Sequence, residues 1–519
     1  MDLLEVPENT MPKRPNILFL MTDQQRHDAL GCVNPIIKTP VLDSIAARGI
    51  RFSQAVCNVP ICVPSRYSMM SGLYGFQIGV KHNTEMIVRD SDLPVPMLPQ
   101  RLSDAGYLTA GFGKTHWYIG SSIMPDVPVE GSRRGFQIRS IQARREPSND
   151  ERGSVYMADD EPDWFEKVAE QSRKSGPGGE AVSGYIGETS SIPPEHHFEG
   201  WLTRQALDFL DDKPDKSRPW FLYLSLDYPH PGFHVPRDFE DLYDIEDFPD
   251  TPPPDPMPDG HRSGKTGDPW GYFEDRWPNM RPEQRRRSCL RYAAICSYVD
   301  SQFGKVIDKL ESMGELDNTF IIFTSDHGDM LGDRGRVSKY CLYEGSVRVP
   351  MIIAGPGLDR HGSIDNRPVE LVDVVPTLLD VARVDIPDAL PGFSLLSDFS
   401  RTASFAEFHG RGYEEYQRAP AAMWRTEDWK LILFMPGRLW DAYHKYDELS
   451  GELYNLTDDP LELNNLFSVP AFAEIRERMT AEMLMHLMCS LGKYPSEPAR
   501  TKIRVTGPET KPDRGKWGK

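Results

Sequence analysis

Short runs of large apolar residues limit the fold of this chain more than any other feature. Asn16–Met21, Trp220–Leu226 and Phe320–Thr324 are almost entirely apolar, which is typical of strands buried on both faces of a parallel sheet. We predict two further strands, at Tyr107–Gly113 and Pro350–Ala354. Segments with helical patterning lie between these runs: Pro40–Gly49, Pro64–Gly72, Met97–Gly106, residues 201–212, Arg281–Gly314 and Leu371–Val381. Alternating strands and helices predict an α/β fold with a large, mostly parallel sheet flanked by helices.

Composition divides the chain into three predicted parts. The 519 residues suffice for one large domain or two. We predict a catalytic α/β domain over residues 1–384, in which residues 117–194 form a loop-rich insertion over the site. Shorter strand-like runs and a final helix predict a smaller α+β part over residues 385–495. Residues 496–519 form a polar tail, which we expect to reach another subunit of a homo-oligomer.

Net charge, apolar runs and cysteine usage indicate which partners and which cellular location to expect. The net charge of −19 disfavours nucleic acid and anionic membranes as partners, although a local cationic pocket can still bind an anion. No apolar run approaches a membrane span, and residues 1–15 do not have the pattern of a signal peptide. Seven cysteines without metal-type pairing fit reduced thiols better than a disulfide framework. We therefore expect a cytoplasmic protein.

The segment around Cys62 has the features of a site at the start of a helix. Pro64 suits the first turn, which places Cys62 at the positive end where anions bind. Arg66 lies about one turn further on the same side and can hold a sulfate or phosphate oxygen. A free cysteine is more often a small buried hydrophobe, and that reading suits Cys57, whose following proline has the wrong offset.

Two predicted strands end in acids. Asp23-Gln24 follows the first strand and Asp326-His327 follows a late one, and ligands of open α/β sheets bind beyond such strand ends. With an oxygen from residue 62, these side chains can enclose one divalent cation. The oxygen-rich donor set favours Ca²⁺, with Mn²⁺ or Mg²⁺ as alternatives, and the histidine favours Mn²⁺. Asp23 alone is more typical of a turn or a cap, so the prediction of a cation site depends on Asp23, the Cys62 motif and Asp326-His327-Gly328 taken together.

A series of motifs between residues 15 and 467 resembles the sulfatase branch of the alkaline phosphatase superfamily. The motifs are Thr22-Asp23-Gln24, Cys62-x-Pro-Ser-Arg66, Gly111-Phe-Gly-Lys-Thr-His116, Pro229-His-Pro231, Ser325-Asp-His-Gly-Asp329, Lys339-x-x-x-Tyr-Glu-Gly345 and Glu452-Leu-Tyr-Asn-Leu456. The resemblance implies an alkaline-phosphatase-like fold. It also implies that a formylglycine-generating enzyme oxidises Cys62 to an aldehyde, whose hydrate attacks a small-molecule sulfate ester and then expels the sulfate.

The resemblance also implies a role for each residue of the site. The implied metal ligands are Asp23, Gln24, Cys62, Asp326 and His327. Arg66 and Lys114 steady the nucleophile and the ester oxygens, and His116 takes a proton when the sulfated intermediate collapses. His230 and Lys339 face the leaving oxygen, while Asn83 and His234 contact the substrate.

Two positions depart from the common sulfatase pattern. Many sulfatases carry a second aspartate where this chain has Gln24, and an asparagine where it has His327. The variant resembles choline sulfatases and phosphonate monoester hydrolases, but the pair Lys114 and His116 is typical of sulfatases. We therefore predict sulfate ester hydrolysis. Phosphonate monoester or phosphodiester hydrolysis is the first alternative, and a non-catalytic binding protein with the same fold is the second.

Overall fold

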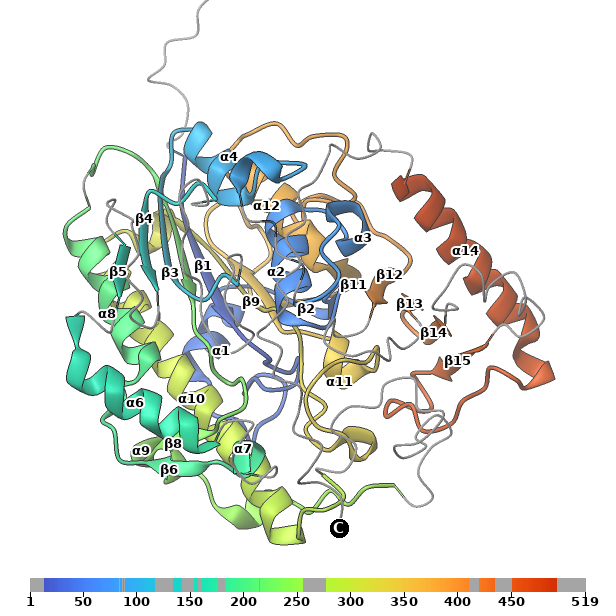
Figure 1. Ribbon diagram of the computed structural model, residues 1–519. Helices are drawn as coiled ribbons and strands as arrows, with labels where there is room; N and C mark the ends of the chain where they lie inside the picture. The colour runs from blue at the N-terminus through green and yellow to red at the C-terminus, as the bar shows by residue number, and fades with distance from the viewer. Residues whose placement is uncertain are drawn as a thin grey trace, which may run out of the picture.

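The computed structural model describes residues 14–83, 85, 87, 89–116, 134–141, 154–156, 160–175, 183–213, 215–254, 277–409, 420–434 and 450–491. The predicted polar tail over residues 496–519 lies outside the described residues, as does much of the predicted insertion. Within the described part, strand–helix alternation produces a large sheet with helices on both faces (Figure 1).

The large sheet is mostly parallel, as predicted. Only β10 among its nine strands runs antiparallel to its neighbours. In spatial order the strands are β11 (Ser363–Glu370), β2 (Gly49–Val56), β10 (Met351–Ala354), β9 (Thr319–Ser325), β1 (Asn16–Thr22), β7 (Trp220–Ser225), β3 (Leu108–Gly113), β4 (Ile138–Ile141) and β5 (Ser154–Tyr156).

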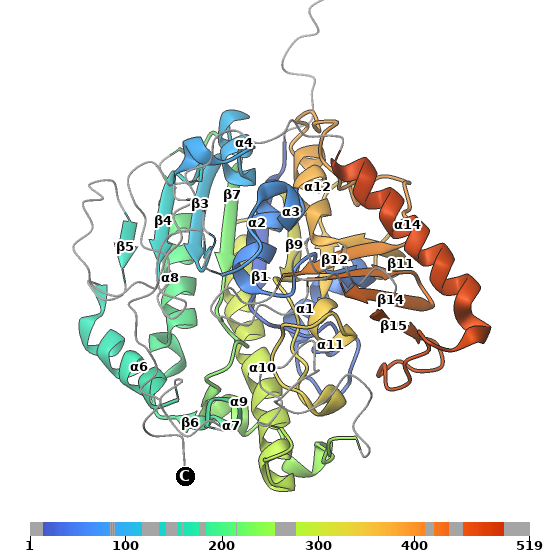
Figure 2. The ribbon, with the colours of Figure 1, turned by 45° about the vertical axis from the view of Figure 1, so that its right-hand side comes forward.

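Two layers of helices bury the apolar strands. Ile17 and Phe19 of β1 belong to the core on one face, and the intervening Leu18 belongs to the core on the other, as expected for the period of two along a strand. The two views agree on which helices cover each face (Figure 2). One face carries α1 (Pro40–Ala47), α8 (Phe198–Asp211) and α10 (Pro282–Ser312); the other carries α2 (Cys62–Ser71), α4 (Leu98–Asp104) and α12 (Val374–Val381).

Two predictions about local structure need correction. The described parts of the interval 117–194 are not all loop, because β4 and β5 extend the large sheet and α6 (Pro162–Ser175) is a regular helix. The helix predicted from Pro64 begins earlier, at Cys62, and ends before Gly72, whose φ of 75° is left-handed. The remaining short elements are α3 (Gly75–Ile78), α7 (Ser183–Ile186), β6 (Glu188–Ser190), β8 (His234–Pro236), α9 (Arg237–Glu240) and α11 (Glu344–Val347).

A second, antiparallel sheet forms the C-terminal part. Its order is β12 (Ser404–Phe408), β13 (Ala421–Arg425), β14 (Trp429–Phe434) and β15 (Ser450–Asn455), and α14 (Ala473–Leu491) packs on it. This agrees with the predicted smaller α+β part, whose boundary at residue 385 stays a prediction. Across the described ranges, no helix combines the length and the apolar character that a membrane crossing needs.

A buried ion-pair network joins the small sheet to α11. Lys430 of β14 is fully buried; its Nζ lies 2.7 Å from Glu344 Oε1 and 2.7 Å from Glu462 Oε1. Arg425 of β13 also binds Glu344, at 2.8 and 2.9 Å. Lys430 Nζ further donates to the carbonyl of Leu342, at 3.1 Å. The small sheet therefore fixes the position of α11 and of the segment before it through these buried contacts.

Replacing Lys430 by methionine should lower the free energy of unfolding by about 3–5 kcal/mol, because the buried Glu462 loses its cation and the buried Glu344 loses one of its cationic partners. Chemical denaturation of both proteins measures the difference. Arg48→Met is the matched control, since Arg48 pairs with Asp317 at the surface and should cost under about 1 kcal/mol. Equal losses in the two variants would contradict the prediction.

We predict that His197 makes the free energy of unfolding depend on pH. Burial lowers the pKa of His197 to about 4, below its ordinary value of 6.5, and its Nε2 lies 3.0 Å from Ser190 Oγ. The pKa of His197 is lower in the folded than in the unfolded protein. The contribution of neutral His197 to the free energy of unfolding is therefore complete above pH 6.5 and is lost as the pH falls toward 4. His197→Gln should therefore reduce the loss of unfolding free energy between pH 7 and pH 4 by about 3 kcal/mol. Denaturation of both proteins at both pH values tests this, and equal losses would contradict it.

Candidate active site

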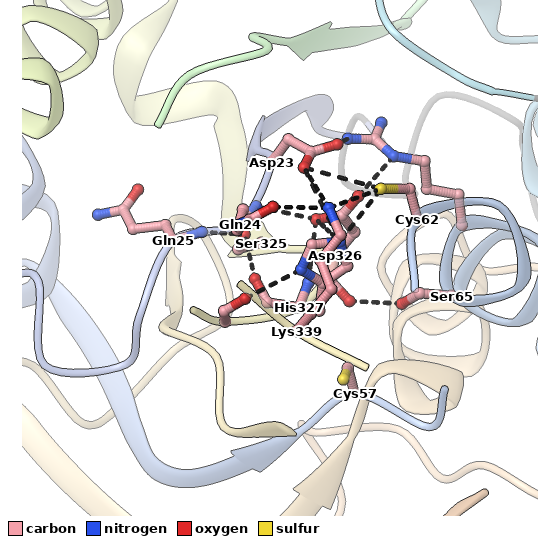
Figure 3. A network of polar contacts seen from close by, with 12 residues as sticks. Asp23, Gln24, Gln25, Cys57, Cys62, Ser65, Ser325, Asp326, His327 and Lys339 are labelled. Carbon is pink, nitrogen blue, oxygen red and sulfur yellow. Dashed lines mark hydrogen bonds and ion pairs between the residues drawn. The ribbon is translucent and has the colours of Figure 1, made fainter. Parts of the chain in front are cut away.

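Strand register brings the two predicted acids together. β1 and β9 are parallel neighbours in which Thr22 lies opposite Ser325, so Asp23 and Asp326 leave the same edge of the sheet. The N-terminus of α2 lies at this edge (Figure 3). Cys62 Sγ lies 3.9 Å from Asp23 Oδ1. The grouping predicted from motif order is therefore a real spatial cluster.

The start of α2 is set by a residue from outside the helix. Ile61 has extended backbone and Cys62 is the first helical residue. The backbone N–H of Val63 donates to Asn83 Oδ1 at 3.0 Å, while Pro64 has no N–H that needs a partner. Asn83, predicted to contact substrate, thus caps the helix in the structure. Cys62 occupies the end of α2 at which the helix dipole favours negative charge.

Arg66 binds both acids at once. Its Nε donates to Asp326 Oδ2 at 2.8 Å and its Nη2 to Asp23 Oδ2 at 3.0 Å. Its Nη1 donates to the carbonyl of Lys114 and to Ser225 Oγ, at 2.6 and 3.0 Å. The side chain is fully buried, so the guanidinium is a fixed charge that holds the carboxylates in place.

A second cation reaches Asp23 from the neighbouring strands. Lys114, just after β3, places Nζ 2.9 Å from Asp23 Oδ2 and 2.7 Å from Asp227 Oδ1. Asp227 follows β7 and was not among the predicted site residues. It carries the signal that identified the other two acids, since it comes directly after the buried apolar run that ends at Leu226. Asp227 therefore orients Lys114 toward the cluster.

Lys339 contacts the side chain of residue 62 directly. Its Nζ donates to Gln24 Oε1 at 2.6 Å and to Cys62 Sγ at 3.2 Å. Burial opposes its charge, but Cys62 and other neighbours raise the pKa of Lys339 above its ordinary value. Burial, and next the charge on Asp23, raise the pKa of the Cys62 thiol to about 11. At neutral pH an unmodified Cys62 is thus a protonated thiol, which is a weak nucleophile.

His327 presents a lone pair to the same cluster. Its Nδ1 lies 3.0 Å from the carbonyl of Gly328, which assigns the proton to Nδ1 and leaves Nε2 as an acceptor. Burial, and next the charge on Lys339, hold the pKa of His327 well below its ordinary value. Its Nε2 lies 3.2 Å from Cys62 Sγ, 3.5 Å from Asp326 Oδ1 and 3.8 Å from Asp23 Oδ1.

The two acids have opposite pKa shifts. Burial opposes ionisation of Asp23, but the charges of its neighbours, led by Lys114, hold the pKa of Asp23 well below its ordinary value. Burial, and next the charge on Asp23, raise the pKa of Asp326 to about 7. Opposite shifts are the electrostatic mark of two carboxylates that share one small volume.

The donor set fits a divalent cation. One ligand atom from each of Asp23, Cys62, Asp326 and His327 lies within 4.8 Å of the others, and all four residues are buried. Two carboxylates, a neutral imidazole and an oxygen in place of the Cys62 sulfur suit Ca²⁺, Mn²⁺ or Mg²⁺. Gln24 Oε1 shares Lys339 Nζ with Cys62, so the amide oxygen faces the same volume.

The remaining predicted residues differ in position. His230 lies close enough to Asp23 to be one of the groups that lower the pKa of Asp23. Burial, and next the charge on Lys339, lower the pKa of His230 itself to about 3, so its ring is neutral at pH 7. His116 is buried just after Lys114, with a left-handed φ of 59°. His234 lies on β8, where its Nδ1 is 3.4 Å from Glu188 Oε1. The pairing of β8 with β6 therefore places His234 beside Glu188.

Comparison with known proteins shows to which family this chain belongs. A sulfatase model matches residues 15–384, and a model of the N-sulphoglucosamine sulphohydrolase C-terminal part matches residues 332–488. The chain is 27% identical to an arylsulfatase of Clostridium perfringens over 494 residues, covering 89% of this chain and 92% of the relative. It is 30% identical to a choline-sulfatase of Rhizobium meliloti over 481 residues, covering 88% and 83%.

The fold agrees with solved structures. A phosphonate monoester hydrolase of Agrobacterium radiobacter superposes with a TM-score of 0.70 at 23% identity, covering 92% of this chain and 96% of the other. The predicted alkaline-phosphatase-like fold is thereby confirmed. The model match over most of the chain, together with the choline-sulfatase relative, shows that the chain belongs to the sulfatase family.

Proposed function

We propose that this protein hydrolyses sulfate esters of small molecules with a formylglycine derived from Cys62. The observation that carries the proposal is the position of Cys62. It begins α2, and its sulfur lies 3.2 Å from both His327 Nε2 and Lys339 Nζ and 3.9 Å from Asp23 Oδ1. Relatives named arylsulfatase and choline-sulfatase support a sulfate ester as the substrate.

Two groups complete the proposed site. Formylglycine supplies a hydrated aldehyde whose hydroxyl is the nucleophile. A divalent cation held by Asp23, Gln24, Asp326, His327 and residue 62 supplies a Lewis acid that polarises the ester. We propose Ca²⁺, with Mn²⁺ and Mg²⁺ as alternatives, and a formylglycine-generating enzyme as a partner. The cytoplasmic location and the homo-oligomer stay predictions of the sequence.

Cations of the chain bind the negative charge of the ester. The Lys339 ammonium lies beside residue 62. Lys114 pairs with Asp23, and Arg66 pairs with both Asp23 and Asp326. Negative charge develops on the leaving oxygen, which we propose His230 and Lys339 face. A preorganised donor of this kind contributes about 10²–10³ in rate. We propose that His116 would accept a proton from the modified residue 62, and that Asn83, which caps α2, also contacts the substrate.

A phosphonate monoester or phosphodiester is the second candidate substrate. The observation that favours it is the donor set itself, because Gln24 and His327 replace the aspartate and asparagine of many sulfatases. Both reactions have a similar pentavalent geometry and a similar spread of negative charge, so the cations around residue 62 can serve either one. The ratio of kcat/KM for an aryl sulfate to that for an aryl phosphonate decides between them. We expect the sulfate to be preferred, and a ratio below one would assign the site to phosphonates.

Peptide mapping of active enzyme tests the nucleophile. The tryptic peptide Phe52–Arg66 contains both Cys57 and Cys62. We expect an aldehyde at residue 62 and a thiol at residue 57, which is an internal control in the same peptide. Fully active enzyme that carries only thiols would refute the proposal. A non-catalytic binding protein would instead lack hydrolysis altogether with both sulfate and phosphonate esters.

A further inference from the structure

The Gln24 side chain is held in an unusually complete set of contacts. Its backbone is left-handed, with a φ of 67°, which is costly for a residue with a Cβ. Its backbone N–H donates to Asp326 Oδ1 at 3.1 Å, and its carbonyl accepts from Tyr292 at 2.8 Å. In the side chain, Oε1 accepts from Lys339 and Nε2 donates to Asp329 (Figure 3 shows Gln24 and Lys339 in place).

Asp329 is the partner that decides which way this amide faces. The residue is fully buried, and its Oδ1 accepts from the backbone N–H groups of Leu331 and Ser338, at 2.7 and 3.0 Å. Its Oδ2 accepts from Gln24 Nε2. Three N–H donors converge on one carboxylate. Asp329 therefore connects Gln24 to the backbone of Ser338, the residue next to Lys339.

An amide has one end that accepts and one that donates, and a carboxylate only accepts. Asp329 thus fixes Gln24 Nε2 on its own side and turns Oε1 toward Lys339 and Cys62. The opposite orientation would bring two acceptors together at Asp329 and point an N–H at the Lys339 ammonium. We propose that Asp329 is a positioning residue that makes Gln24 present an oxygen to the proposed cation. This rests on the proposed function, because it concerns the same cation site.

Exchanging the acceptor tests the orientation. Asp329→Asn keeps an oxygen for the backbone of Leu331 and Ser338 and turns an NH₂ group toward Gln24, which favours the reversed amide. We expect Ca²⁺ and Mn²⁺ to bind this variant about 10–100-fold more weakly, the range found when a group behind a metal ligand is removed. Isothermal titration of chelator-treated protein with each metal chloride measures the affinity without using activity.

A carboxylate at residue 24 needs no orienting partner. Gln24→Glu should therefore restore affinity in the Asp329→Asn background, where the new NH₂ group can donate to Glu. In the wild-type background the same substitution sets two carboxylates against each other, so its benefit should be smaller. A benefit of equal size in both backgrounds would overturn the proposal, because it would reflect added charge alone.

Controls separate orientation from damage to the fold. Asp300→Asn makes the same change at a buried aspartate that accepts from Val41 and Leu42, and it should leave cation affinity unchanged. If Asp329→Asn does not fold, Gln24→Met still tests the premise of the inference, that the amide oxygen binds the cation, since losing that oxygen should weaken binding as much. Wild-type affinity in either variant would overturn this inference while wild-type hydrolysis of an aryl sulfate still upheld the proposed function. Wild-type protein that binds neither metal would overturn the inference and the proposed cation site together.

Discussion

Cys62→Ala is expected to lower kcat/KM for an aryl sulfate by at least about 10⁴-fold, since removal of a nucleophile costs on the order of 10⁶ in enzymes of this kind of mechanism. No other side chain lies as close to both His327 and Lys339 in the described contacts. Alanine cannot be oxidised to an aldehyde, so no hydroxyl occupies the start of α2. Steady-state hydrolysis with purified wild-type and variant protein measures the effect.

A matched substitution five residues before Cys62, in the same tryptic peptide, separates chemistry from packing. Cys57 is also fully buried, but its Sγ lies 3.9 Å from the carbonyl of Ser346 and outside the cation cluster. Cys57→Ala removes the same sulfur from a comparable environment and should leave hydrolysis close to the wild-type rate. Similar losses in the two variants would assign the effect to packing. Near-wild-type activity of Cys62→Ala would remove residue 62 from the mechanism.

The strand ends could be predicted because their pattern is local. Asp23 and Asp326 each follow a run of buried apolar residues, and the rule for parallel sheets places such ends on one edge. β2 was missed for the converse reason. Arg51, Ser53 and Gln54 interrupt its apolar pattern, and all three side chains are only partly buried. Hydrogen bonding to β10 and β11 on either side stabilises β2 as a strand, although its own sequence lacks a strand pattern.

Other features of the site depend on contacts that cross the fold. Asp227 matters because β7 lies between β1 and β3, which brings Lys114 to both Asp227 and Asp23. The sequence does not give the order of the strands in the sheet, so it does not predict that these three side chains are neighbours. The start of α2 depends likewise on Asn83, which caps it from another segment. His234 lies on β8, and the pairing of β8 with β6 brings it beside Glu188, a neighbour that the sequence did not predict.

Arg66→Met should both destabilise the protein and disable it. Arg66 is fully buried and bonds to Asp23 and Asp326 at 3.0 and 2.8 Å. Removing one partner of a buried ion pair leaves uncompensated charge, which costs about 3–5 kcal/mol of unfolding free energy. The acids would also lose their fixed geometry, so we expect kcat to fall by about 10²–10³-fold. Denaturant titration and steady-state kinetics on the same preparation measure the two effects.

The two effects have different origins, and two further variants separate them. Arg134 is also fully buried and pairs with Asp90 at 2.6 Å, so Arg134→Met should lower stability but leave kcat unchanged, since Asp90 is not part of the cluster around Cys62. Arg66→Lys keeps the charge but cannot span both acids as the guanidinium fork does. It should therefore recover part of the stability and little of the rate. If Arg66→Lys instead recovered full activity, charge alone would hold the two carboxylates, and the forked contact with Asp23 and Asp326 would have no part in catalysis.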